Sequence, residues 1–167
     1  HPGPGGAAVK IPFTLNGREV VVESRPDVRL VHVLRNDFGL MGTKEGCLQG
    51  YCGFCLVVLN DELVPSCMVP IFSVFRGTVL TIEGFRDTPD YRDIEHAFLA
   101  EDVAPCGSCA AAKILTTHVL LKENPNPTEK QIRKALSGVL CRCTSFTALV
   151  AGVKTAAVNR RLRSHVR

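Results

Sequence analysis

The sequence predicts an α+β fold in which a small curved sheet crossed by one helix precedes a four-helix bundle. Three observations carry this prediction. Up to about residue 83 the apolar residues mostly follow strand patterns, whereas after a polar, turn-rich segment at 84–93 they recur at helical spacing. A third observation is that the eight cysteines fall into two groups, one in each half. Each half is therefore expected to build a site of its own.

The first half contains the expected strands and one main helix. Strands at 11–15 and 18–23 flank Asn16-Gly17, which is the strongest short hairpin signal because both turn positions tolerate a positive φ. Leu30, Val33 and Leu34 recur at helical spacing and predict a helix over 30–40, with Gly39 as its C-cap. The remaining predicted elements are a buried strand at 56–60, a return strand toward Cys67, a short helix at 69–75 and a strand at 78–83.

The second half is expected to be helical throughout. The predicted helices cover 94–102, 106–123, 128–140 and 146–162. Prolines in the NPNP segment at 124–127 separate the second helix from the third, because proline lacks the N–H donor that a helix interior needs. Thr128 and Gln131 have the spacing of a capping box. Four helices in such a short segment favour a compact bundle. The predicted domains are 9–84 and 91–162.

Composition limits the possible functions. The chain has 167 residues, of which 46% are hydrophobic and 22% charged, so one or two globular domains are expected. The net charge of +4 comes without a basic stripe interleaved with aromatic residues, which disfavours nucleic-acid binding. No apolar run reaches the roughly 18 residues of a membrane span, and the start HPGPGGAAVK lacks the apolar region of a signal peptide. A cytoplasmic location is predicted, where grouped cysteines indicate metal rather than disulfides.

The first cysteine group has a spacing typical of iron–sulfur proteins. Its members are Cys47, Cys52, Cys55 and Cys67, spaced C-x4-C-x2-C-x11-C, and the first three match the plant-type [2Fe–2S] pattern. Such a cluster with four thiolates is anionic, and backbone N–H groups that approach its sulfurs stabilise it. Gly46, Gly50 and Gly53 would allow that approach, because they lack a Cβ. A structural zinc site is the alternative, although zinc usually takes two short cysteine pairs.

The second cysteine group consists of two short pairs. Its members are Cys106, Cys109, Cys141 and Cys143, spaced C-x2-C-x31-C-x-C. Both pairs lie at predicted helix starts, where unpaired N–H groups and the helix dipole favour thiolates. Gly107, inside the first pair, is expected to give backbone support. From spacing alone zinc remains open here, whereas the presence of one predicted electron carrier favours a second.

The motifs together resemble one known family. GCLQGYCGFC with PSC, followed by APCGSC and LCRCTSF, is similar to the iron–sulfur subunit of the molybdenum hydroxylases, the family of xanthine dehydrogenase and aldehyde oxidoreductase. The resemblance covers about residues 10–155. It implies a β-grasp, plant-ferredoxin-like domain followed by a four-helix bundle, each with one [2Fe–2S] cluster held by the four cysteines of its half. The chain itself would carry no catalytic residue.

The resemblance also implies partners and a direction of electron flow. Electrons would pass from molybdopterin on a large subunit to the second cluster, then to the first cluster, and then to FAD on a medium subunit. Cys143 would be the ligand nearest the pterin. One departure concerns Pro105, which stands where the family commonly has a glutamine that contacts the pterin. The alternatives left open are a free-standing two-cluster ferredoxin and a structural zinc-binding interaction module.

Overall fold

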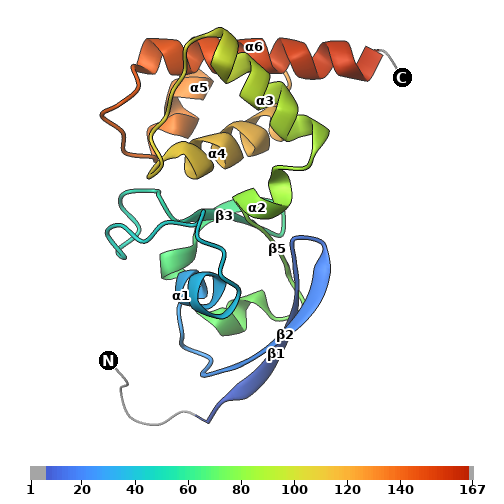
Figure 1. Cartoon of the computed structure of the whole chain (residues 1–167), viewed down its shortest axis with the longest axis vertical. Coiled ribbons are helices and arrows are strands. Elements are labelled where there is room, and N and C mark those ends of the chain that lie inside the picture. Colours follow the sequence, from blue (N-terminus) through green and yellow to red (C-terminus); the bar gives the residue numbers. More distant parts are fainter. Residues whose placement is uncertain (1–6, 166–167) are drawn as a thin grey trace.

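A computed structural model describes residues 7–165 and has the sheet and the helices in two stacked halves (Figure 1). The sheet is five-stranded and mixed, in the order β2-β1-β5-β3-β4. Only β1 and β5 pair in parallel, and the other neighbours are antiparallel. The strands are β1 (Val9–Leu15), β2 (Arg18–Ser24), β3 (Leu56–Leu59), β4 (Glu62–Pro65) and β5 (Thr78–Leu80). The predicted Asn16-Gly17 hairpin is confirmed, with both residues at positive φ.

The helix across the sheet is shorter and less regular than the sequence predicts. It consists of α1 (Leu30–His32), continued by a π-helical turn, η1 (Val33–Asp37). The chain leaves it at Gly39, which has a φ of +67°. Apolar residues of this segment are buried against β1, β3 and β5 in the core of the sheet half. The predicted helix at 69–75 is only the 3-10 turn η3 (Ile71–Val74), preceded by η2 (Ser66–Met68), because Pro70 fixes an extended backbone between the two turns.

The last strand ends earlier than predicted because a distant side chain intercepts it. The Thr81 backbone N–H donates to Asn16 Oδ1 at 2.8 Å, and Asn16 Nδ2 donates to Thr81 Oγ1 at 3.0 Å. The chain then turns into the short helix α2 (Ile82–Phe85). Strand β5 thus ends at Leu80. Asn16, in the turn of the β1–β2 hairpin, holds Thr81 at the point where the sheet half passes into the helical half.

The helical half contains α3 (Pro89–Ala100), α4 (Ala110–Glu123), α5 (Glu129–Leu136) and α6 (Phe146–His165). Helix α3 begins five residues earlier than predicted, inside the polar segment, because the Thr88 hydroxyl accepts the Tyr91 N–H and Pro89 occupies the first turn. Helix α4 begins later than predicted, so that Cys106 and Cys109 lie in a turn before it. The capping box of Thr128 and Gln131 is confirmed at the start of α5.

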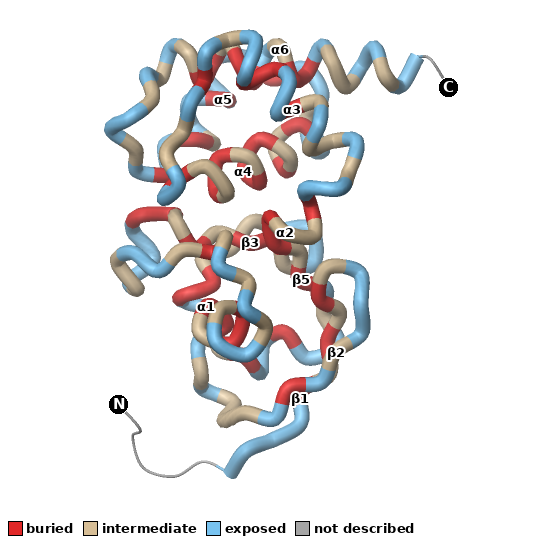
Figure 2. Tube along the Cα trace, in the orientation of Figure 1, coloured by how far each residue is buried: buried red, intermediate tan, exposed pale blue. Residues whose placement is uncertain are grey.

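Each half has its own core, and the two cores meet at β3 and α4. Figure 2 shows the buried segments of α4 lying above those of β3. The core of the helical half also takes in Val58 and Ile82, with Leu63 and Leu80 packed against it. The helices therefore pack against residues of the sheet. Within residues 7–165, no helix combines the length and apolarity that a membrane span requires.

Candidate functional site

The first cysteine group is assembled by a loop and a hairpin. Cys47 and Cys52 lie in the loop between η1 and β3, and Cys55 lies directly before β3. Pairing of β3 with β4 brings Cys55 next to the turn that carries Cys67. Ser66 fixes this approach, because its backbone N–H and its hydroxyl both donate to the Cys55 carbonyl oxygen, at 3.1 and 2.7 Å. Cys55 and Cys67 are buried together.

Backbone N–H groups surround the outer thiols of this group. Cys47 Sγ accepts from the N–H groups of Gln49, Tyr51 and Cys52 at 3.4, 3.2 and 3.4 Å. The Cys47 N–H in turn donates to Cys52 Sγ at 3.5 Å. These donors, led by the Gln49 N–H, lower the pKa of Cys47 to about 6, whereas burial raises the pKa of Cys55 to about 11. The loop is therefore built to stabilise a negatively charged sulfur on its outer side.

At three of the predicted glycines a side chain would meet a close neighbour, a strained backbone or both. A Cβ on Gly46 would stand 2.8 Å from Cys52 Sγ, and Gly50 has a φ of +78°. Gly53 has a φ of +74°, and a Cβ there would stand 2.3 Å from the carbonyl oxygen of Gly138 in the helical half. Gly107 differs, since a Cβ on it would meet no atom within 4 Å and its φ is not in the left-handed range.

The second cysteine group is assembled by two segments far apart in sequence. Cys106 and Cys109 lie in the turn before α4, and Cys141 and Cys143 lie in the loop between α5 and α6. Cys106 Sγ and Cys109 Sγ are 3.7 Å apart, and Cys109 Sγ and Cys141 Sγ are 3.6 Å apart. Cys109 is buried, whereas Cys143 is exposed. The group thus runs from the core of the helical half to its surface.

The electrostatics of the second group follow the same division. N–H groups of Ser108 and Cys109 lower the pKa of Cys106 to about 7, and burial raises the pKa of Cys109 to about 12. The neighbouring Cys106 raises the pKa of Cys143. In the described part of the chain, no three histidine, cysteine, aspartate or glutamate side chains converge as the ligands of one metal ion do. The short sulfur–sulfur contacts instead link the thiols one to the next.

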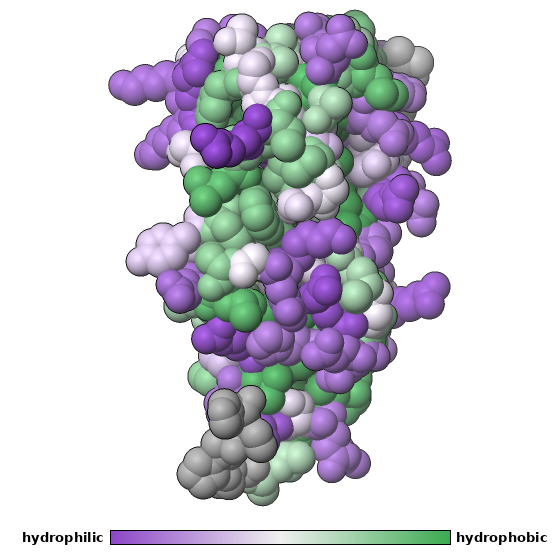
Figure 3. Space-filling view, turned by 60° about the vertical axis from the view of Figure 1, so that its left-hand side comes forward, coloured by the Kyte–Doolittle hydropathy of each residue, from purple (hydrophilic) through white to green (hydrophobic). Residues whose placement is uncertain are grey.

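The two cysteine groups touch across the boundary between the halves. The Leu140 N–H donates to the Cys52 carbonyl oxygen at 3.0 Å, so that one hydrogen bond joins the loops of both groups. Phe54 and Leu56 pack against the cluster of Cys109, Ala112 and Val139. Figure 3 brings forward the side that carries both loops and shows apolar atoms gathered in a band down its middle. Exposed apolar side chains of the two loops include Tyr51 and Leu140.

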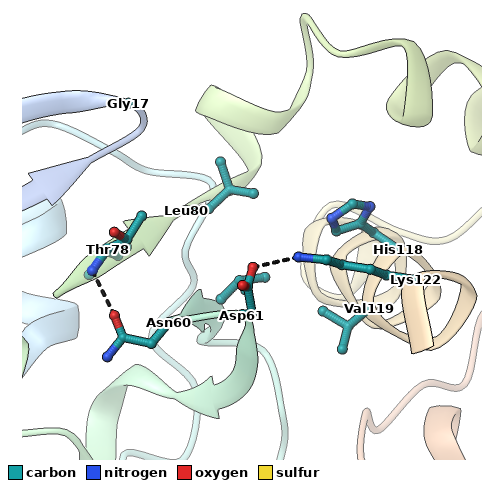
Figure 4. A pocket seen from close by; sticks show the side chains of 10 residues that line it. Gly17, Asn60, Asp61, Thr78, Leu80, His118, Val119 and Lys122 are labelled. Carbon is teal, nitrogen blue, oxygen red and sulfur yellow. Dashed lines mark hydrogen bonds and ion pairs between the residues drawn. The ribbon is translucent and has the colours of Figure 1, made fainter.

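A separate pocket lies between the β3–β4 turn, β5 and α4 (Figure 4). It encloses about 440 Å³ and no cysteine lines it. Lys122 on α4 crosses it to Asp61, with Nζ and Oδ1 2.6 Å apart, and this ion pair ties the halves together. His118 also lines it, with its ring 4.4 Å from that of Phe85 and its Nδ1 3.5 Å from a carboxylate oxygen of Asp90. The geometry at Nδ1 is not that of a hydrogen bond.

Sequence reasoning missed one buried charge beside the second group. Lys113 on α4 is only 1% exposed, and its charge acts on the Cys141 thiol. The signal was a single lysine in the apolar run AAAKIL, one helical turn after Cys109. Without knowledge of the tertiary packing, a single lysine in such a helix is expected to be exposed to solvent.

Comparison with known proteins gives both halves the same assignment. Residues 13–76 match the model of a 2Fe-2S iron-sulfur cluster binding domain, and residues 81–154 match that of a [2Fe-2S] binding domain. The chain is 37% identical over 148 residues to the nicotinate dehydrogenase small FeS subunit of Eubacterium barkeri, covering 89% of this chain and 94% of the relative. It is 40% identical over 148 residues to the isoquinoline 1-oxidoreductase subunit alpha of Brevundimonas diminuta, covering 88% and 97%.

A solved structure extends this similarity to the fold. A chain of quinoline 2-oxidoreductase from Pseudomonas putida 86 superposes with a TM-score of 0.84 at 30% identity, over 93% of this chain and 98% of that chain. The match runs through both halves, so the order of sheet half and helical half is shared. The chain belongs to the family of iron–sulfur subunits of the molybdenum hydroxylases, as its cysteine motifs predict.

Proposed function

We propose that the eight cysteines bind two [2Fe–2S] clusters. The first would be held by Cys47, Cys52, Cys55 and Cys67, and the second by Cys106, Cys109, Cys141 and Cys143. Each set offers four thiols, the number that such a cluster takes. Backbone N–H groups directed at Cys47 Sγ and the 3.6 and 3.7 Å sulfur contacts of the second set suit this ligation. Gly46, Gly50 and Gly53 would allow the first loop to close around its cluster.

The chain is an electron-transfer subunit of an oxidoreductase. The observation that supports electron transfer between the two proposed clusters is the contact between the two cysteine loops. The Leu140 N–H and the Cys52 carbonyl oxygen link a residue of the first set to the neighbour of Cys141 through one hydrogen bond. Each cluster would accept one electron and pass on one electron, so a two-electron oxidation of substrate on a partner would need two passages. No proton or group transfer on this chain is required.

The relatives' names support partner subunits for this chain as well. The matched nicotinate and isoquinoline proteins are described as subunits, and the family resemblance assigns molybdopterin to a large subunit and FAD to a medium subunit. In this assignment electrons enter at the second cluster and leave from the first. The exposure of Cys143 suits a position facing the pterin. Pro105 has no polar side chain, so the partner would have to supply the pterin contact that the usual glutamine makes.

The finer description of the fold belongs to the same proposal. Residues 9–84 would form the β-grasp domain and residues 91–162 the four-helix bundle domain. The crossing of the sheet by α1 and the mutual packing of α3, α4, α5 and α6 support this division. A cytoplasmic location would keep the eight thiols reduced until the clusters are inserted.

The test is to purify the full chain anaerobically and to measure iron, acid-labile sulfide and the visible spectrum. Two [2Fe–2S] clusters require about four irons and four sulfides per chain. A colourless protein that contains zinc would overturn the proposal in favour of a structural module. Co-purification of two larger subunits with a tagged chain would support the complex, whereas a fully loaded chain that captures neither would support a free-standing ferredoxin.

A second measurement assigns the sites. Cys143→Ser should weaken or remove the electron paramagnetic resonance (EPR) signal of the second cluster and leave that of the first, because the two sets share no ligand. Cys47→Ser should do the reverse. Equal loss of both signals in each variant would argue against two independent clusters.

A further inference from the structure

Lys113 lies in an unusual position for a lysine. It follows Cys109 by one turn of α4, and its backbone N–H donates to the Cys109 carbonyl oxygen at 3.0 Å. Only 1% of the residue is exposed, which places it among the largest fully buried side chains of the molecule. It is one of the buried residues of α4, the helix that begins directly after Cys109. The side chain is therefore almost entirely withdrawn from bulk water, on the first turn of the helix that Cys109 caps.

The Lys113 ammonium has no protein carboxylate as a partner. Within residues 7–165, Lys113 forms no ion pair, and its Nζ donates no hydrogen bond. Lys122, two to three turns further along the same helix, shows the ordinary arrangement, because it is exposed and pairs with Asp61. A positive charge on a side chain that is almost entirely buried and has no carboxylate partner is costly, and a negative charge of another kind nearby would stabilise it.

The charge of Lys113 acts on a thiol of the second group. Burial opposes ionisation of Cys141, but the N–H groups of Thr144 and Cys143, the Cys109 thiol and the Lys113 charge together lower the pKa of Cys141. Cys141 Sγ in turn contacts Cys109 Sγ. The charge of Lys113 thus acts on a sulfur that is itself in contact with another sulfur of the group.

Among the described residues, the cation that contacts the first cysteine loop is Arg29, which is exposed and donates from Nη1 to the Leu48 carbonyl oxygen at 2.7 Å. Near its loop Glu45 pairs with His32 at 2.9 Å and with Arg35 at 3.6 Å, so these charges balance one another at a partly exposed position. The thiols of the first group are instead stabilised by neutral backbone N–H groups. A buried cation distinguishes the second group from the first.

We propose that Lys113 is a fixed counter-charge for the second [2Fe–2S] cluster and raises its reduction potential without a comparable effect on the first. This inference rests on the proposed ligation of that cluster. Reduction adds one negative charge to an already anionic cluster, and a nearby buried cation stabilises the reduced form more than the oxidised form. Lys113 would thus make the second cluster a better acceptor for the electron that enters the chain. Lys113 would act on the cluster through its electric charge and would not be a ligand of it.

The experiment is a potentiometric titration of the full chain with both clusters loaded, followed by EPR. In Lys113→Met, a neutral variant of similar length, the equilibrium constant for reducing the second cluster should fall by about tenfold, which is 59 mV for one electron. The first cluster should shift by less than about twofold. Lys113→Arg should restore most of the potential of the second cluster, because it keeps the charge. Lys122→Met removes an exposed lysine from the same helix and should move neither potential.

The outcomes separate this inference from the proposed function. If the unmodified chain gives no second EPR signal, the proposed ligation fails first. If both signals are present and Lys113→Met changes neither potential, or if Lys113→Arg shifts the second cluster as far as Lys113→Met does, the counter-charge is overturned. Lys113→Gln provides a second neutral variant. Loss of the second cluster in both neutral variants but not in Lys113→Arg would support the counter-charge, and its loss in all three would overturn it.

Discussion

The two cysteine groups show different ways to gather four thiols. The first is mostly local, because Cys47, Cys52 and Cys55 lie in one loop and a single hairpin adds Cys67. The second forms only when the turn before α4 contacts the loop after α5. In the sequence, 31 residues lie between Cys109 and Cys141. Local geometry therefore shapes the first group, and tertiary packing of the helices shapes the second.

This difference has an energetic consequence. The conformation of the first loop depends on residues at positive φ between Cys47 and Cys52, namely Leu48 and Gly50. Loosening of the helical half acts on the second group through the distance between its two segments. Conditions that weaken the helices should therefore remove the second cluster before the first, while changes at the joint of the two loops should affect both.

The largest effect is expected at that joint. Gly53→Ala places a Cβ 2.3 Å from the Gly138 carbonyl oxygen and forces a positive φ on alanine, so one backbone must move. We expect a loss of about 2–4 kcal/mol in the free energy of unfolding, since left-handed backbone costs about 1–2 kcal/mol and overpacking about 1–3 kcal/mol. Urea unfolding followed by circular dichroism measures the loss. Both EPR signals should broaden or decrease.

Gly107→Ala is the matched control for Gly53→Ala. It also adds a methyl group to a glycine in a cysteine loop, but at a position with open space and no positive φ. Its stability should lie within about 0.5 kcal/mol of the original chain. If the two alanine variants are equally stable, the joint between the loops is looser than the structure places it.

Several features of both halves could be predicted because their determinants are local. The Asn16-Gly17 turn, the first cysteine loop and the Thr128 capping box each depend on residues within a few positions of one another. The end of β5 could not be predicted, because it depends on Asn16, a residue 65 positions away that binds Thr81. A prediction from hydrophobic periodicity alone extends the strand beyond this point.

The relation between the cysteine groups could be predicted only in part. Spacing and resemblance suggest two clusters in series, and Pro105 marks a departure that is visible in the sequence. The hydrogen bond from Leu140 to Cys52 and the burial of Lys113 are tertiary facts. The helical pattern around Lys113 has no strong polar face to show which side is buried, since alanine, threonine and leucine surround the helix.

A smaller effect is expected at Asp90, which ties α3 to α4 and α6. Its carboxylate lies 3.5 Å from His118 Nδ1 and 2.9 Å from an Arg160 nitrogen, and it also pairs with Arg163. His118 and the two arginines, against the effect of burial, lower the pKa of Asp90 to about 2. Asp90→Asn should cost about 1–2 kcal/mol at pH 7, allowing for partial exposure. In urea the second EPR signal should disappear before the first.

The sign of the pH dependence follows from that lowered pKa. The stability that Asp90 contributes is fully present above the ordinary carboxyl pKa of about 4 and is lost as the pH falls toward 2. The difference between the original chain and Asp90→Asn should therefore shrink between about pH 4 and pH 2. Asp27→Asn, at an exposed pair with Arg25, is the control and should show little pH-dependent difference. A constant difference for Asp90→Asn across this range would contradict the assignment.

The smallest effect is expected at the capping box of α5. The Thr128 hydroxyl accepts the Gln131 N–H at 3.4 Å, and the Gln131 side chain accepts the Thr128 N–H at 2.8 Å. Thr128→Ala should cost about 1 kcal/mol. Thr147→Ala, at an exposed position in α6, should be neutral or slightly stabilising because alanine is the better helix former. Buried Ile132 and Leu136 anchor α5 beyond the cap, so both EPR signals should persist. Selective loss of the second signal in Thr128→Ala would mean that the whole of α5, and not only its buried end, holds Cys141 in place.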